Sequence, residues 1–219
     1  MLVVTDRLTY LETATVLSFL AASIALTIMP GPDNLFVLTE SLTKGVRNGV
    51  AVSVGLVMGV MVHTFAAAVG LSLIIKNSVL AFSIIKYLGT AYLLYLAYQT
   101  YKEERPELAS LKAEIQYSTC LFSLIRKGFM MNVLNPKVSL FFIALLPQFI
   151  SEGGFSNSIQ MGLLGVIFMG QALVIFSLIS MLSGSLTKYV NDPKFWNITK
   201  WSKVGVLSIL ALVLAFSRR

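Results

Sequence analysis

Prolines interrupt two apolar, membrane-length segments of this chain, and the two breaks occupy corresponding places in its two halves. The first break is Pro-Gly-Pro-Asp-Asn at residues 30–34, and the second is Asn-Pro-Lys at residues 135–137. Hydrocarbon offers no hydrogen-bond partners, so a broken backbone at membrane depth must be covered by protein or line a wet cavity. The pair of breaks therefore predicts one buried polar site where the two halves of the chain meet.

The composition is that of a polytopic membrane protein in contact with a lipid bilayer. The chain has 219 residues, of which 56% are hydrophobic and only 12% charged, whereas a soluble domain is about 25% charged. A single cysteine, Cys120, excludes an internal disulfide, and a single histidine, His63, argues against a histidine metal cluster. We therefore expect no cofactor and no metal site. The basic residues flank apolar segments rather than forming a face, so we expect no nucleic-acid partner.

Six segments are long enough to cross a bilayer, which takes about 20 residues. They cover approximately residues 13–29 (continuing at 34–43), 48–75, 79–101, 128–150, 156–186 and 201–216. Two halves with an odd number of spans each are necessarily inverted relative to one another. The expected fold is an all-α membrane protein of six transmembrane helices in two inverted three-helix repeats, the first helix of each being broken at proline. We expect one transporter domain over 1–219, with repeat one at 1–101, a cytoplasmic linker at 102–119 and repeat two at 120–219.

The distribution of basic residues predicts the orientation. One set of loops and segment ends carries eleven Lys and Arg residues, and the other set, which includes both termini, carries five. Basic residues concentrate on the cytoplasmic side, so both termini are expected outside. The N-terminal residues lack the basic region of a cleaved signal peptide.

The first break should end one helix near Met29 and start another near Asp33. Pro30 and Pro32 lack backbone donors, and Gly31 allows the bend. The new helix directs its positive end into the break, where it can hold a carboxylate. Asp33 then has two interpretations: a ligand for a substrate ammonium that also carries the coupling proton, or merely the N-cap of the second half-helix.

The second break repeats this pattern with the opposite charge. Asn135 is a good N-cap, Pro136 suits the first helical position, and Lys137 follows at a depth from which it cannot easily reach water. A charge inside the membrane costs roughly 2.5–3.5 kcal/mol and is usually paired. We therefore expect Lys137 to approach Asp33, in a pair that is either only structural or also part of transport.

Further polar and small residues within the spans have two interpretations each. Glu40 is either a second titratable group on the pathway or an interfacial residue beside Lys44, and His63 is either a proton relay or a hydrogen-bonded packing residue. The glycines spaced four apart, such as Gly55 and Gly59, favour close helix packing. That packing can lie within one chain or between two chains, so the sequence is compatible with both a monomer and a homodimer.

The chain resembles the LysE/RhtB-type amino-acid exporter family, which includes lysine exporters and homoserine/threonine efflux translocators. The residues that carry the resemblance are 30–34, Gly-Val-Arg-Asn-Gly at 45–49, Gly55, Gly59, His63, Ala-Ala-Ala-Val-Gly-Leu at 66–71, Lys-Tyr-Leu-Gly-Thr-Ala-Tyr-Leu at 86–93, 135–137, Phe-Phe at 141–142 and Pro-Gln-Phe at 147–149. The resemblance implies an exporter in the bacterial inner membrane, driven by an ion gradient. It also implies that Asp33 and the turn at 135–137 belong to the site.

The favoured function is secondary-active efflux of an amino acid or close derivative by proton antiport. The expected substrate-binding residues are Asp33, Asn34, Asn135 and Lys137. The candidate proton carriers are Asp33, Glu40 and His63. No phosphate-binding Gly-x-x-x-x-Gly-Lys-Ser/Thr loop is present, so ATP is not expected as the direct energy source. The alternatives are a metal-ion carrier on a related scaffold, a membrane-embedded enzyme, for which the chain offers few catalytic groups, and a non-transporting scaffold.

Overall fold

The computed structural model describes residues 13–29, 31–71, 79–103, 120–151, 155–185 and 192–216, and the elements formed in these ranges are all helices. The α-helices are α1 (Thr13–Ile28), α2 (Pro32–Lys44), α3 (Val46–Ala66), α5 (Val79–Lys102), α7 (Leu121–Val133), α8 (Pro136–Leu140), α9 (Asn157–Met181) and α11 (Pro193–Phe216). Short turns of π-helix, η2 (Ala67–Leu71) and η3 (Phe141–Leu145), and of 3-10 helix, η4 (Leu146–Phe149), extend α3 and α8.

Within these ranges, four unbroken helices are long and apolar enough to cross a membrane, and two bent pairs raise the number of candidate spans to six. The bent pairs are those predicted from the prolines. The axes of α1 and α2 differ by 60°, and α7 differs by 49° from the segment Pro136–Phe149. Both helix breaks are therefore present, although Pro30 lies outside the described residues.

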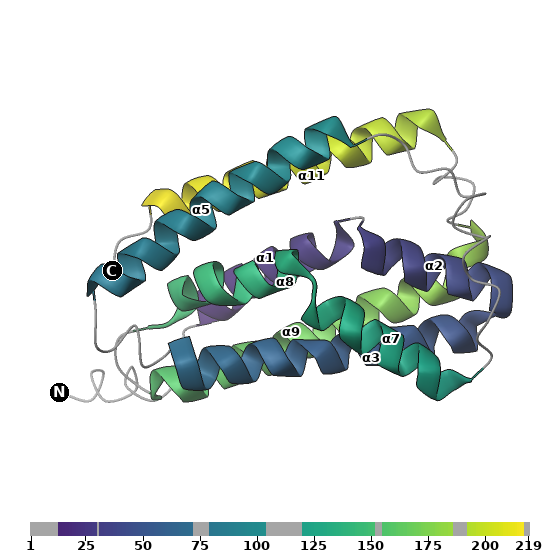
Figure 1. Cartoon of the computed structure of the whole chain (residues 1–219), viewed down its shortest axis with the longest axis horizontal. Coiled ribbons are helices and arrows are strands. Elements are labelled where there is room, and N and C mark those ends of the chain that lie inside the picture. The colour runs from purple at the N-terminus through teal and green to yellow at the C-terminus, as the bar shows by residue number, and fades with distance from the viewer. Residues whose placement is uncertain are drawn as a thin grey trace.

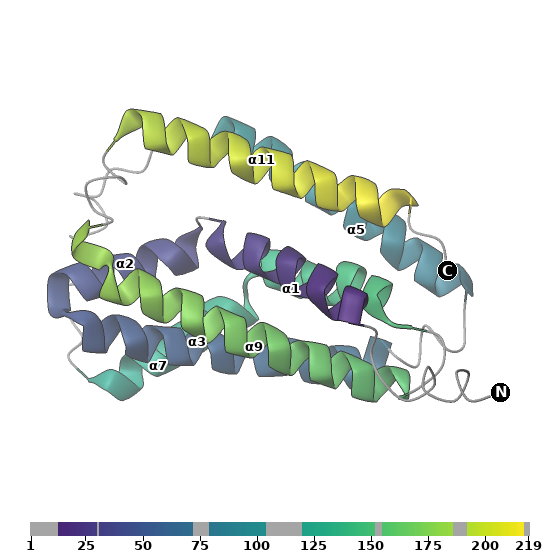
Figure 2. The same cartoon turned by 180° about the vertical axis from the view of Figure 1, so that it is seen from behind.

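The helices form two layers. Figure 1 shows α5 and α11 side by side above a bundle made of the other helices, and Figure 2 shows the same separation from behind. The pair contacts the rest of the protein chiefly through η3. Helices α1 and α7 begin at opposite ends of the bundle, whereas the start of α1 and the end of α11 lie at the same end (Figure 1).

Glycines allow α3 and α7 to pack backbone against backbone. A Cβ atom on Gly55 would overlap the carbonyl oxygen of Ile125, and one on Gly128 would overlap that of Val52. Gly59 packs against Asn132 in the same seam. The prediction that Gly55 and Gly59 serve helix packing is confirmed, and both contacts lie within one chain.

An aromatic cluster holds the segment after the second break in place. Phe141 and Phe142 of η3 are fully buried and pack against Phe168 of α9 with ring centroids 5.4 and 5.3 Å apart. Phe19 of α1 contacts Phe141 at 5.7 Å and Phe149 at 5.3 Å. Because the cluster joins α1, α9 and η3, it fixes the position of the second break relative to the first.

Two predicted spans begin earlier than expected. The fourth starts at Leu121 rather than near 128, and the sixth starts at Pro193 rather than near 201. Lys200 therefore lies within α11 instead of preceding it, and Lys203 lies near the middle of the helix instead of at its start. The sequence obscured this because three lysines between 194 and 203 give the segment the composition of a loop.

Candidate functional site

A cavity of about 600 Å³ lies between the two breaks and the α5–α11 pair. Both breaks contribute to its lining, and so do the C-terminal end of α5 and the middle of α11. The lining residues are Met29, Gly31, Pro32, Leu96, Gln99, Thr100, Lys102, Glu103, Asn135, Pro136, Lys137, Lys203 and Leu207.

The C-terminal end of α1 is capped by side chains that come from both breaks. Asn34, on α2, donates its amide to the carbonyl oxygens of Thr27 (3.0 Å) and Ile28 (3.3 Å). Lys137 donates its ammonium to those of Leu26 (3.1 Å) and Met29 (3.5 Å). The last carbonyls of a helix have no partner within the helix itself, and an amide and an ammonium supply these partners here.

Asp33 and Asn135 join the two breaks directly. The Asn135 side-chain Nδ2 donates to the Asp33 carboxylate Oδ2 over 2.6 Å. Asp33 is only 4% exposed, so this short bond to a carboxylate lies inside the protein. Hydrogen bonds to ionised groups are roughly twice as strong as those between neutral groups.

The expected ion pair between Asp33 and Lys137 is not formed, although both residues belong to the described part of the chain. They lie in the same region and interact electrostatically, but each has another partner. Lys137 turns to the end of α1 because the free carbonyls and negative dipole end of that helix attract a cation. Asn135 takes the place beside Asp33 that was expected for Lys137.

Asp33 is also not the N-cap of its helix. That position belongs to Gly31, which has no side chain to bond the free N–H groups, and Pro32 is the first helical residue. Asp33 lies in the first turn of α2, where a negative charge still suits the helix dipole. The interpretation of Asp33 as a mere cap is therefore wrong.

The prediction for Asn135 as an N-cap is confirmed. Its side-chain oxygen accepts from the backbone N–H of Lys137 at 3.0 Å, and Pro136 occupies the first helical position. Asn135 thus caps its own helix through its oxygen and holds Asp33 through its nitrogen.

The other predicted site residues lie behind the cavity wall. Neither Asp33 nor Asn34 lines the cavity, and the same holds for Glu40 and His63. Glu40 is 2% exposed, with its carboxylate 3.5 Å from the ammonium of Lys44 one turn away. His63 places Nε2 at 3.1 Å from the carbonyl oxygen of Asn132, near the end of α7, and its ring is 5.9 Å from that of Phe142.

The role of Lys203 escaped the sequence analysis, and so did the partner of Gln171, a polar residue expected within the fifth span. Lys203 is 5% exposed and forms an ion pair with Glu103 in the cavity wall, at 2.8 Å. Placing the start of the last span at 193 would have shown Lys203 as a charge inside a membrane helix. Gln171 of α9 donates to the hydroxyl of Thr27 at 2.9 Å, and nothing in its sequence surroundings indicates this partner.

The described residues include no group of three His, Cys, Asp or Glu side chains that could hold a metal ion.

Several proteins resemble the chain over most of its length. A Vibrio cholerae protein described as an uncharacterized membrane protein is 27% identical over 190 residues, 86% of this chain and 89% of that protein. The uncharacterized membrane protein YrhP of Bacillus subtilis is 29% identical over 193 residues, 83% of this chain and 89% of YrhP. A leucine efflux protein of Salmonella typhimurium is 26% identical over 206 residues, 92% of each chain. No solved structure matches the chain significantly.

The sequence profile of one transporter family, described as LysE type translocator, matches residues 24–218. The match includes both helix breaks and every residue that lines the cavity. It confirms the resemblance noted from the proline motifs. The chain belongs to the LysE type translocator family.

Proposed function

We propose that this protein is a secondary transporter, not an enzyme, and that it exports an amino acid with an apolar side chain in exchange for protons. The observation that carries the proposal is the junction of the two breaks, where Asn135 both binds Asp33 and lines the cavity. Relatives described as leucine efflux proteins support the substrate class. The apolar side chains of Met29, Leu96 and Leu207 in the cavity wall support it as well.

The carboxylate of the substrate binds Lys137. An ammonium has three N–H donors, and two of them are directed to Leu26 and Met29. The third is available to a carboxylate in the cavity that Lys137 lines. Gly31, also in the cavity wall, brings the N-terminal end of α2 to the same place, and that end favours an anion.

Asp33 couples transport to protons because three groups compete for its carboxylate. In this structure the Asn135 amide holds it. A substrate ammonium replaces the amide with a stronger partner that carries a positive charge, and a proton displaces the ammonium by removing the negative charge of the carboxylate. One charge crossing 100 mV is worth about 2.3 kcal/mol, which supports an amino-acid gradient of roughly 50-fold.

The architecture in which this happens is, we propose, a single domain of two inverted three-helix repeats in the bacterial inner membrane. The opposite starting points of α1 and α7 support the inversion (Figure 1). The excess of basic residues on one side supports termini outside and a cytoplasmic linker. Residues 104–119 of that linker lie outside the described residues.

Purified protein in liposomes tests the proposal. Labelled leucine should leave the liposomes faster when a proton gradient is imposed in the direction that drives antiport, and an uncoupler should abolish the difference. Export that continues unchanged in the presence of the uncoupler would contradict coupling to protons. Lack of any movement of leucine, isoleucine, valine and methionine would contradict the proposed substrate class.

A further inference from the structure

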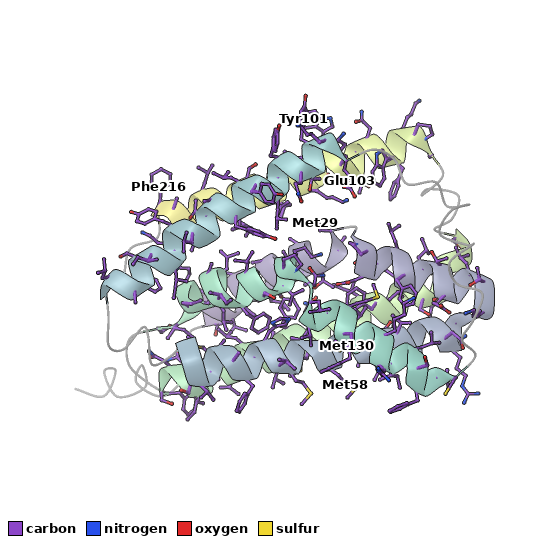
Figure 3. All side chains as sticks on the ribbon, in the orientation of Figure 1. Met29, Met58, Tyr101, Glu103, Met130 and Phe216 are labelled. Atoms are coloured by element: carbon purple, nitrogen blue, oxygen red, sulfur yellow. The ribbon has the colours of Figure 1, made fainter. Side chains whose placement is uncertain are left out.

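The cavity has a second charged group, built by α5 and α11 rather than by the helix breaks. Glu103 follows the last residue of α5, and its carboxylate Oε2 accepts a hydrogen bond from Lys203 Nζ at 2.8 Å. Lys200, on the same helix as Lys203, donates to the carbonyl oxygen of Glu103 at 3.0 Å. Figure 3 shows Glu103 on the side of α5 that faces Met29, whereas Tyr101 lies on the outer side.

Lys203 is held inside the protein rather than extended to solvent. It is 5% exposed, and its ammonium lies 5.2 Å from the centroid of the Trp196 ring, in a cation–π contact. It also borders a second, mostly apolar cavity of about 380 Å³ between α1 and α11. Because cavities flank Lys203 on both sides, its side chain has room to change partner.

The charged residues of the larger cavity are unbalanced. Three lysines, Lys102, Lys137 and Lys203, line it together with one carboxylate, that of Glu103. Lys203 and Lys137 repel each other electrostatically. Charges interact several times more strongly in such a partly desolvated space than in water. The cavity therefore attracts a carboxylate and opposes a ligand that adds a positive charge.

We propose that Lys203 is a specificity-determining residue, which binds the carboxylate of an entering neutral amino acid and excludes amino acids with a cationic side chain. Glu103 is a positioning residue that holds Lys203 in the cavity wall until the substrate arrives. On entry, before the substrate moves on to Lys137 and Asp33, its carboxylate binds Lys203 and its ammonium binds Glu103. One ion pair is thus exchanged for two, and the net charge of the cavity stays the same.

This inference rests on the proposed amino-acid export and adds its selectivity. A neutral amino acid brings one positive and one negative group, which match Lys203 and Glu103. Lysine or arginine brings a further positive charge into a cavity that already has an excess of two, three lysines against one carboxylate. The positive charge of the lysine or arginine side chain has no carboxylate to pair with among the residues that line the cavity, because Glu103 already binds the substrate's α-ammonium.

The unaltered protein provides the first test. In liposomes loaded with leucine, the counterflow of labelled leucine measures binding and exchange without a proton gradient. Nε-acetyl-lysine should inhibit this counterflow at a concentration at least about tenfold lower than lysine does, because acetylation removes the side-chain charge and retains the carbon chain. Equal inhibition by the two compounds would overturn the charge filter. Absence of leucine counterflow altogether would instead overturn the proposed export.

Variants of Lys203 identify the residue responsible. Lys203→Gln should reduce the preference for Nε-acetyl-lysine over lysine by about tenfold, and Lys203→Arg should retain it. Lys194→Gln is the matched control, because it removes an exposed positive charge from the same helix, away from the cavity. If Lys203→Gln and Lys194→Gln both keep the full preference, Lys203 is not the determinant. Should Lys203→Gln fail to fold, loss of the preference in Lys203→Arg would contradict the proposal as well.

Discussion

Asn135 donates its side-chain amide to the Asp33 carboxylate over 2.6 Å and so connects the helix break of one half of the chain to that of the other. The same Asn135 caps α8 through its oxygen. A change in the partner of Asp33 therefore acts directly on the backbone at the second break. Protonation of the Asp33 carboxylate therefore has a structural consequence in both halves of the chain.

Replacing Asp33 with Asn should reduce leucine counterflow by roughly 10- to 100-fold, because the amide cannot form the charged hydrogen bond to the substrate ammonium. The residual rate should also be independent of pH between 5.5 and 8, since the competing proton has lost its site. Counterflow in liposomes at several pH values measures both effects.

Asp192→Asn is the control for this variant. Asp192 is exposed and accepts from the backbone N–H of Lys194 at the start of α11, and Asn caps helices equally well. If the Asp33→Asn protein still exports leucine at the original rate in response to the proton gradient, Asp33 does not take part in proton coupling.

Replacing Lys137 with Met should lower the free energy of unfolding by about 2–4 kcal/mol, because the carbonyls of Leu26 and Met29 lose a charged donor. Thermal unfolding in detergent, followed through the fluorescence of Trp196 and Trp201, measures the loss. Lys194→Met, an exposed change on α11, should leave the transition unchanged. A Lys137→Met protein as stable as the original would show that the end of α1 does not depend on this contact.

Replacing Gly55 with Ala should destabilise the protein by about 1–3 kcal/mol, because the added methyl group overlaps the backbone of Ile125 and forces α3 and α7 apart. Gly162→Ala is the matched control, since a Cβ atom at Gly162 meets no other atom within 4 Å. The same unfolding measurement compares the two. Equal stability of both variants would contradict the close approach of α3 and α7.

The proposed orientation predicts which face of the membrane carries Cys120. This cysteine is exposed and directly precedes α7, at the end expected in the cytoplasm, so a membrane-impermeant maleimide should label it only in inside-out vesicles. In a Cys120→Ser background, Ser156→Cys should be labelled only in right-side-out vesicles or intact cells. Ser156 is exposed at the other end of the molecule, before α9. The reverse labelling pattern would show that the orientation in the membrane is opposite to the one proposed.

Local features of the sequence predicted the helix breaks well. Proline lacks a backbone donor wherever it occurs, so the ends at Ile28 and Val133 and the cap at Asn135 follow from neighbouring residues alone. Gly55 and Gly59 were predictable for a similar reason, because only small side chains permit such close packing.

The partners of the charged residues could not be predicted in the same way. The Lys137 ammonium had two candidate partners, the Asp33 carboxylate and the free carbonyl oxygens at the end of α1. Which of them it contacts depends on distances set by the packing of the whole bundle. The role of Lys203 was missed because its neighbours Lys194 and Lys200 gave the start of α11 the appearance of a loop. Composition describes a segment on average, whereas the cavity depends on a single residue within it.

The limited contact of α5 and α11 with the rest of the protein has a mechanical consequence. In α5, Gly89 packs directly against Ala144 of η3, while Glu103 lies about 20 Å farther along the helix at a rise of about 1.5 Å per residue. A tilt of a few degrees around Gly89 leaves that contact nearly still and displaces Glu103 by an ångström or more. The two helices thus act as a lever with its fulcrum at η3, and its long arm carries the charges that face the substrate.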